Sequence, residues 1–160
     1  MSTWTENDEV SQRTQFRIRY DMKMLNVESL KVVEELYLFR WDVTIKGPED
    51  SPFTGHEYTM MVVFPADYPD NPPSLFMKTA LYHPNMAGDT LTEFGKIRLD
   101  YLTPEFWSED FTITDVFERL ESVMRNPDLS EELVVNPEAA RLCGKDREAW
   151  ARSARNFCEK

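Results

Sequence analysis

The sequence contains little cysteine and little histidine, with two of each in 160 residues. Cys143 and Cys158 both lie towards the C-terminal end, without CxxC spacing and without partner histidines. Neither a disulfide framework nor a metal site is therefore predicted, and no cofactor is expected. Sparse, unclustered cysteine is typical of a protein of the cytosol or nucleus, where thiols stay reduced.

Long apolar runs and an excess of positive charge are absent as well. No run approaches the roughly 18 apolar residues that cross a bilayer, and residues 2–9 are polar and acidic rather than signal-like. With 29 acidic against 18 basic residues the net charge is −11, which repels a phosphate backbone or an anionic lipid surface. We therefore expect protein partners, and neither nucleic acid nor a membrane.

The sequence does contain enough apolar material for one core. Apolar residues make up 41% of the chain, which includes 4 Trp, 6 Tyr and 10 Phe. A length of 160 residues is close to that of a typical domain, and no internal repeat or linker interrupts it. A single domain over residues 1–160 is the resulting prediction.

Residues 8–26 have the spacing of an amphipathic helix. Phe16, Tyr20 and Met24 recur at i, i+4 and i+8, with Ile18, Met22 and Leu25 beside them, so this apolar set is expected to face the core. The opposite face is expected to be basic and is interpreted as the only local concentration of positive charge. It would hold Arg17, Arg19 and Lys23.

A pattern of short strands follows the first helix. Turn segments rich in proline, at residues 47–52 and 69–73, separate them, because proline cannot donate to a ladder. Each strand has a successor close by in the sequence, which favours an antiparallel meander of four strands. The segments rich in β-branched, aromatic and methionine residues are 30–33, 36–45, 58–64 and 75–78.

Helical spacing returns after a long stretch, residues 82–111, that has little period of its own. Loops of this length in a compact domain are usually functional, so we look for a site there. Thr112 or Thr114 is expected to cap a helix that ends before Pro127, and Asn136 and Asp146 are expected to begin two more. Helices at the ends of a meander sheet predict an α+β fold.

Five motifs, in order along the chain, resemble those of ubiquitin-conjugating enzymes. The resemblance covers nearly the whole chain, from the first helix to the last. Together the five motifs are far more specific than any one alone. The motifs are residues 41–55 (WDVTIKGPEDSPFTG), 64–73 (FPADYPDNPP), 82–85 (YHPN), 95–100 (GKIRLD) and 107–113, which contains Trp107-Ser108 and Thr112-Ile113.

The resemblance implies transfer of ubiquitin or a ubiquitin-like modifier through a cysteine thioester, but Arg98 occupies the position of that cysteine. A guanidinium stays protonated and cannot act as the nucleophile that a thiolate provides. In the family an asparagine that matches Asn85 stabilises an oxyanion; without a thioester we expect Asn85 to brace the loop instead. His83 and Pro84 complete the signature, His83 as a structural histidine, and Asp100 ends the segment around residue 98.

The resemblance also implies two partner surfaces. Ligases of the family dock on apolar or small residues at the places held here by Asp70, Glu109 and Asp110, so ordinary ligase docking is expected to be weak. The basic face of the first helix lies where the family meets its activating enzyme, which makes it a candidate contact for an acidic partner. The spacing between Asn85 and Arg98 is also longer than usual, and Gly88-Asp89 could turn a hairpin there.

Three functions stay open on this basis. The first is a catalytically inactive relative, like the ubiquitin-conjugating enzyme variants, that binds ubiquitin, a modifier, an active conjugating enzyme or an activating enzyme. The second is an active conjugating enzyme in which arginine has replaced the cysteine; the retained 83–85 signature favours it. The third is a scaffold subunit of an unrelated complex, since a fold does not fix function. The longer spacing between Asn85 and Arg98 and the acidic residues at the ligase-docking positions favour the first function.

Overall fold

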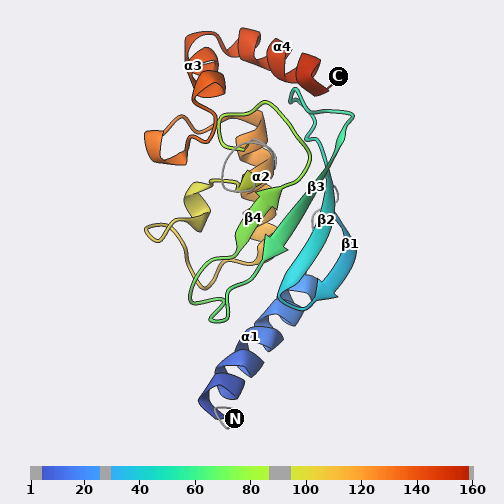
Figure 1. Cartoon of the computed structure of the whole chain (residues 1–160), viewed down its shortest axis with the longest axis vertical. Helices are drawn as coiled ribbons and strands as arrows, with labels where there is room; N and C mark the ends of the chain where they lie inside the picture. The colour runs from blue at the N-terminus through green and yellow to red at the C-terminus, as the bar shows by residue number, and fades with distance from the viewer. Residues whose placement is uncertain (1–4, 26–29, 87–94, 159–160) are drawn as a thin grey trace.

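The computed structural model describes residues 5–25, 30–86 and 95–158, so the Gly88-Asp89 turn lies outside the described residues. The predicted α+β class is confirmed (Figure 1). Within these described residues, one α-helix precedes the sheet and three follow it, with short 3-10 turns at η2 (Asp100–Leu102) and η3 (Glu131–Leu133). The principal elements are α1 (Thr5–Lys23), β1 (Leu30–Tyr37), β2 (Arg40–Lys46), β3 (Glu57–Val63), β4 (Ser74–Met77), α2 (Ile113–Arg125), α3 (Pro137–Lys145) and α4 (Arg147–Cys158).

The sheet is an antiparallel meander in the order β1-β2-β3-β4. Alternation along β2 decides which side faces the core, because Trp41, Val43 and Ile45 are buried while the residues between them are half-buried. The pairing of Trp41 with Val62 and of Ile45 with Tyr58 continues the same apolar face onto β3. One face of the sheet is thereby committed to packing.

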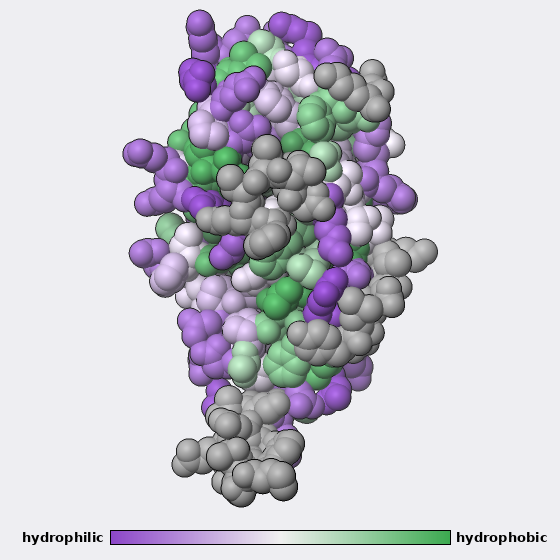
Figure 2. All heavy atoms as spheres, in the orientation of Figure 1, coloured by the Kyte–Doolittle hydropathy of each residue, from purple (hydrophilic) through white to green (hydrophobic). Residues whose placement is uncertain are grey.

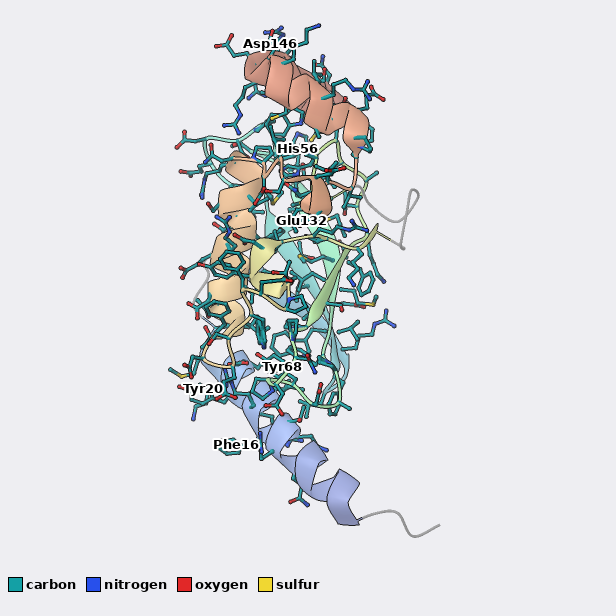
Figure 3. The ribbon with its side chains drawn as sticks, turned by 90° about the vertical axis from the view of Figure 1, so that its left-hand side faces the viewer. Phe16, Tyr20, His56, Tyr68, Glu132 and Asp146 are labelled. Atoms are coloured by element: carbon teal, nitrogen blue, oxygen red, sulfur yellow. The ribbon has the colours of Figure 1, made fainter. Side chains whose placement is uncertain are left out.

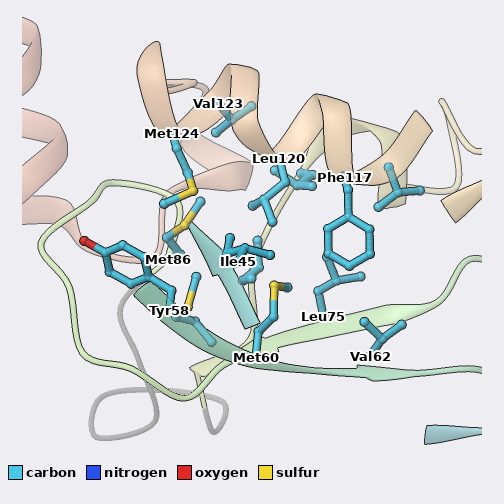
Figure 4. Packing of buried hydrophobic residues seen from close by; sticks show 14 of the residues in the cluster. Ile45, Tyr58, Met60, Val62, Leu75, Met86, Phe117, Leu120, Val123 and Met124 are labelled. Carbon is cyan, nitrogen blue, oxygen red and sulfur yellow. The ribbon is translucent and has the colours of Figure 1, made fainter. Parts of the chain in front are cut away.

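Helix α2 covers that apolar face (Figure 4). Its buried residues recur at helical spacing, so a single stripe points at the sheet. Burying each large side chain of this kind stabilises the fold by about 1.5–3 kcal/mol. The residues of α2 that meet the sheet include Phe117, Leu120, Val123 and Met124, opposite Met60, Val62 and Leu75.

The predicted helix starts are correct. Thr112 caps α2 in a capping box, because its side chain accepts from the Asp115 amide and the Asp115 carboxylate accepts from the Thr112 amide. The Asn136 side chain accepts from the Ala139 amide at the start of α3. Asp146 does the same for the Ala149 amide at the start of α4.

The predicted core face of the first helix is correct for Ile18, Met22 and Leu25 but wrong for the i, i+4, i+8 series. Phe16, Tyr20 and Met24 are 74%, 46% and 50% exposed, and Phe16 and Tyr20 lie on the outer side of α1 in Figure 3. Among residues 12–23 of this helix, the buried positions are Thr14, Ile18 and Asp21.

The physical reason is the surface that α1 meets, which offers polar partners. Thr14 Oγ1 donates to the Ala66 carbonyl at 3.0 Å, and the Tyr68 hydroxyl donates to Asp21. Burial raises the pKa of the Asp21 carboxyl, although hydrogen bonds from Tyr68 and Arg17 oppose that shift. Satisfied polar side chains can thus be buried in place of apolar ones.

Candidate functional site

Residue 98 lies on a short extended segment beside β4. The Ile97 amide donates to the Leu75 carbonyl at 2.8 Å, and Ile97 and Leu99 are both buried. Alternation in an extended segment turns the side chain between them away from the core, and Arg98 is half-buried. An arginine therefore fits at this position without disturbing the core.

Arg98 joins two parts of the site. Its amide donates to the Asn85 carbonyl at 3.1 Å, and its Nη1 donates to the Glu132 carbonyl at 3.4 Å. Glu132 belongs to η3 and is exposed. The arginine thus spans from the 97–99 segment to the turn on the other side of the site, a contact that nothing in the local sequence indicated.

Asn85 is completely buried and its side-chain amide is fully engaged. Nδ2 donates to the carbonyls of Asp128 at 2.7 Å and Leu133 at 2.8 Å, while Oδ1 accepts from the Asp128 amide at 2.9 Å. Both amide protons are therefore committed to backbone oxygens. In this arrangement the side chain holds residues 128–133 against the 83–86 turn and has no proton left to donate to an oxyanion.

His83 and Pro84 hold the same turn in place. His83 Nε2 lies 2.8 Å from the Val123 carbonyl and Nδ1 accepts from the Asn85 amide at 2.9 Å, so the neutral ring carries its proton on Nε2. Complete burial lowers the pKa of His83 to about 3. The Pro84 carbonyl accepts from the amides of Val135 at 2.7 Å and Asn136 at 3.1 Å.

Asp100 links the site to α2. Arg119 binds its carboxylate through two nitrogens, each at 2.9 Å, and the hydrogen bond to Asp100 raises the pKa of Arg119. The guanidinium also lies 5.6 Å from the centre of the Tyr101 ring, which stacks on Phe111. Arg119 is 19 positions from Asp100, so no local sequence pattern could have paired them.

Neither cysteine belongs to this site. Cys143 is buried in the core on α3. Cys158, on α4, is half-buried and its Sγ lies 3.1 Å from the Tyr58 hydroxyl of β3. Both thiols are thus held by the C-terminal helices, away from the segment that carries residue 98.

The predicted docking acids lie on two turns that the fold joins. Trp107 Nε1 donates to the Pro69 carbonyl at 2.8 Å, which fastens the turn of Glu109 and Asp110 to the turn of Asp70. All three carboxylates are exposed. Asp70 Oδ1 also lies 3.8 Å from Arg13 of α1, an ion pair that the sequence analysis missed because 57 positions separate the two residues.

The basic residues of α1 are divided by the fold. Arg17 is half-buried, with Nε 3.3 Å from Asp21 Oδ1 and Nη2 donating to the Phe111 carbonyl at 2.6 Å. It therefore braces α1 against the turn before α2. Arg19 and Lys23 are exposed and remain available to a partner.

The described residues include neither a candidate metal site nor a helix that could span a membrane. Over 5–25, 30–86 and 95–158, no cluster of histidine, cysteine and carboxylate side chains could hold a metal ion. No helix in the part of the chain that the structure describes is long and apolar enough to span a membrane.

The fold and the site together define a class. An antiparallel meander is covered by α2, and a buried His-Pro-Asn turn is hydrogen-bonded to the segment of residue 98, as the resemblance in the sequence implies. Comparison with protein families matches residues 12–158 to the family described as ubiquitin-conjugating enzyme, and the chain belongs to that family. This membership supports proteins as partners.

Proposed function

We propose that this chain is a catalytically inactive member of the ubiquitin-conjugating enzyme family. It would act as a protein-binding module or as a cofactor in a ubiquitin or ubiquitin-like modifier pathway. The observation that carries the proposal is the guanidinium at residue 98, at the outward-facing position between buried Ile97 and Leu99. Thioester exchange needs a thiolate there, and a guanidinium offers neither a free lone pair nor a leaving group.

The hydrogen bonds of Asn85 support the same proposal. A side chain that stabilises an oxyanion must present a donor to the place where charge develops. Both Nδ2 protons of Asn85 point instead at carbonyls of residues 128 and 133. The retained signature is thus explained by folding alone, since His83, Pro84 and Asn85 tie α2, η3 and α3 together.

The docking acids favour a binding role with partners other than the usual ligases. Asp70, Glu109 and Asp110 place negative charge where an apolar contact would otherwise form. Burying an unpaired carboxylate costs several kcal/mol, so a partner of this surface should bring basic side chains. We place this activity in the cytosol or nucleus because both cysteines are free thiols.

The direct test is charging with a modifier. The unaltered protein is incubated with activating enzyme, ATP and ubiquitin, or a ubiquitin-like modifier, and analysed on gels with and without reductant. We expect no thiol-sensitive adduct. A reducible adduct on the unaltered protein would refute the proposal, and Cys143→Ser and Cys158→Ser would then show which thiol carries it.

The second candidate is an active enzyme interrupted by arginine. The observation in its favour is that Ile97, Leu99 and the 83–85 turn still form an ordered frame around residue 98. Arg98→Cys tests it in the same assay. Adduct formation by Arg98→Cys with one modifier would support the interrupted enzyme, whereas no adduct with any modifier would support the binding module. A scaffold subunit of an unrelated complex would be shown by affinity capture that retrieves no component of a modifier pathway.

A further inference from the structure

The C-terminal helices carry a second concentration of positive charge, besides that of the first helix. Residues 137–158 contain five basic and three acidic side chains, a net charge of +2 on a chain of net charge −11. This corrects the interpretation that the first helix holds the only local concentration of positive charge. All five basic side chains are exposed: Arg141, Lys145, Arg147, Arg152 and Arg155.

Most of these residues differ in their partners from five of the arginines elsewhere in the chain. Arg13, Arg17 and Arg119 each lie within 4.0 Å of a carboxylate oxygen. Arg40 and Arg125 do so as well. Within the part of the chain that the structure describes, no carboxylate forms an ion pair with Arg141, Lys145, Arg152 or Arg155.

The packing of the two helices directs these side chains outward. Helix α3 buries Ala139 and Cys143, and α4 buries Trp150 and Ala154. Arg141 and Lys145 are one turn apart on the exposed side of α3. Arg152 and Arg155 are three positions apart on α4. The two helices form the end of the molecule opposite the start of α1 (Figures 1 and 3), and Figure 2 shows hydrophilic side chains at this end with hydrophobic ones among them.

We propose that this C-terminal basic surface, defined by Arg141, Lys145, Arg152 and Arg155, binds an acidic segment of a partner protein. Guanidinium groups bind carboxylates through two parallel hydrogen bonds, and these guanidiniums have no carboxylate partner among the described residues. The inference goes beyond the proposed function and does not depend on what residue 98 does.

Charge across the whole molecule favours a short acidic segment over an extended polyanion. The residues outside 137–158 carry a net charge of −13, because the whole chain carries −11 and this segment +2. Screening limits attraction to about 8 Å at physiological salt, so a short segment can contact the basic surface alone. A nucleic-acid strand would extend past it onto acidic surface and be repelled.

The test uses the full chain and a fluorescein-labelled peptide of alternating glutamate and serine, with binding followed by fluorescence anisotropy. Arg152→Glu with Arg155→Glu reverses charge on the proposed surface. Lys46→Glu with Lys78→Glu, at exposed positions on neither the first nor the C-terminal helices, is the matched control because it changes the net charge by the same amount. We expect the first double variant to weaken peptide binding about tenfold or more and the control to stay within about twofold.

Several outcomes would overturn this inference. Equal weakening by both double variants would show that only net charge matters, and no peptide binding at low salt would remove the surface as a site. Tighter binding of a labelled oligothymidine than of the peptide would make nucleic acid the ligand. Self-association that Arg152→Glu with Arg155→Glu abolishes in sedimentation would make a second copy the partner. Circular dichroism checks that each variant folds, and Arg152→Gln with Arg155→Gln repeats the test without new carboxylates.

Discussion

Asn85 and Asp128 form a reciprocal pair, in which Asn85 Nδ2 donates to the Asp128 carbonyl at 2.7 Å and the Asp128 amide donates to Asn85 Oδ1 at 2.9 Å. The two residues are 43 positions apart. The pair closes the end of the loop after α2 onto the 83–86 turn. An asparagine that the family resemblance marks for chemistry is thereby a structural crosslink in this chain.

Removing this crosslink should destabilise the whole domain. Asn85→Ala leaves two backbone carbonyls and one amide without their partner, and each such buried group costs about 1–3 kcal/mol. We expect the free energy of unfolding in urea to fall by about 3 kcal/mol. Asn71→Ala is the control, because Asn71 is exposed; a loss at Asn85 no larger than at Asn71 would contradict the structural role.

Acid should weaken the fold through His83. Its pKa is lowered from 6.5 to about 3 by burial, so below pH 6.5 the unfolded chain binds a proton that the folded chain does not. Above pH 6.5 His83 is neutral in both states, so it causes no loss of stability. As the pH falls from 6.5 towards 3, the free energy of unfolding decreases by about 1.4 kcal/mol for each pH unit.

Unfolding measured between pH 7 and pH 4 checks this dependence. His83→Gln keeps a donor for the Val123 carbonyl but cannot titrate, so its stability should fall less steeply with acid than that of the unaltered protein. Parallel slopes in the two proteins would show that His83 is not the group responsible.

The bond between Asp100 and Arg119 should be stabilising rather than catalytic. Asp100→Asn removes the charge that Arg119 binds through two nitrogens, and since both side chains are partly exposed we expect a loss of about 1 kcal/mol. Glu109→Gln, at an exposed carboxylate, should change stability by less than about 0.5 kcal/mol. Thermal unfolding at low and high salt would measure both, and an equal effect of the two variants would be evidence against the bond.

Two variants of α1 test which of its side chains are buried in the core. Ile18→Ala creates a cavity at a fully buried position and should cost about 2–4 kcal/mol. Phe16→Ala removes a larger side chain that is 74% exposed and should cost less than about 0.5 kcal/mol. If Phe16→Ala lowered the free energy of unfolding in urea more than Ile18→Ala, the result would support burial of Phe16, as the i, i+4, i+8 spacing predicts.

Much of the fold could be predicted because its determinants are local. The caps at Thr112, Asn136 and Asp146 are short-range hydrogen bonds between side chain and backbone, and they begin helices where the sequence indicated. Proline-rich turns likewise separated the strands. The α1 face could not be predicted by spacing alone, because Thr14 and Asp21 are buried only through partners at Ala66 and Tyr68.

The candidate site divides in the same way. Its residues were found from the sequence, since Asn85 and Arg98 lie in recognisable motifs, but their bonding was not. Arg98 contacts the Glu132 carbonyl 34 positions away, and Asn85 contacts the Asp128 backbone 43 positions away. Arg119 lies 19 positions from its partner Asp100. Local patterns carry no information on such pairings.

The sequence by itself determined the α+β class, the family and the lack of a thiol at residue 98, because these follow from residue identity, spacing and short-range hydrogen bonds. The tertiary structure decided which face of α1 is buried, and it committed both Asn85 amide protons to residues 128 and 133. It also turned the basic side chains of α3 and α4 to solvent. The physical reason is that burial and long-range hydrogen bonds exist only after distant segments have packed together.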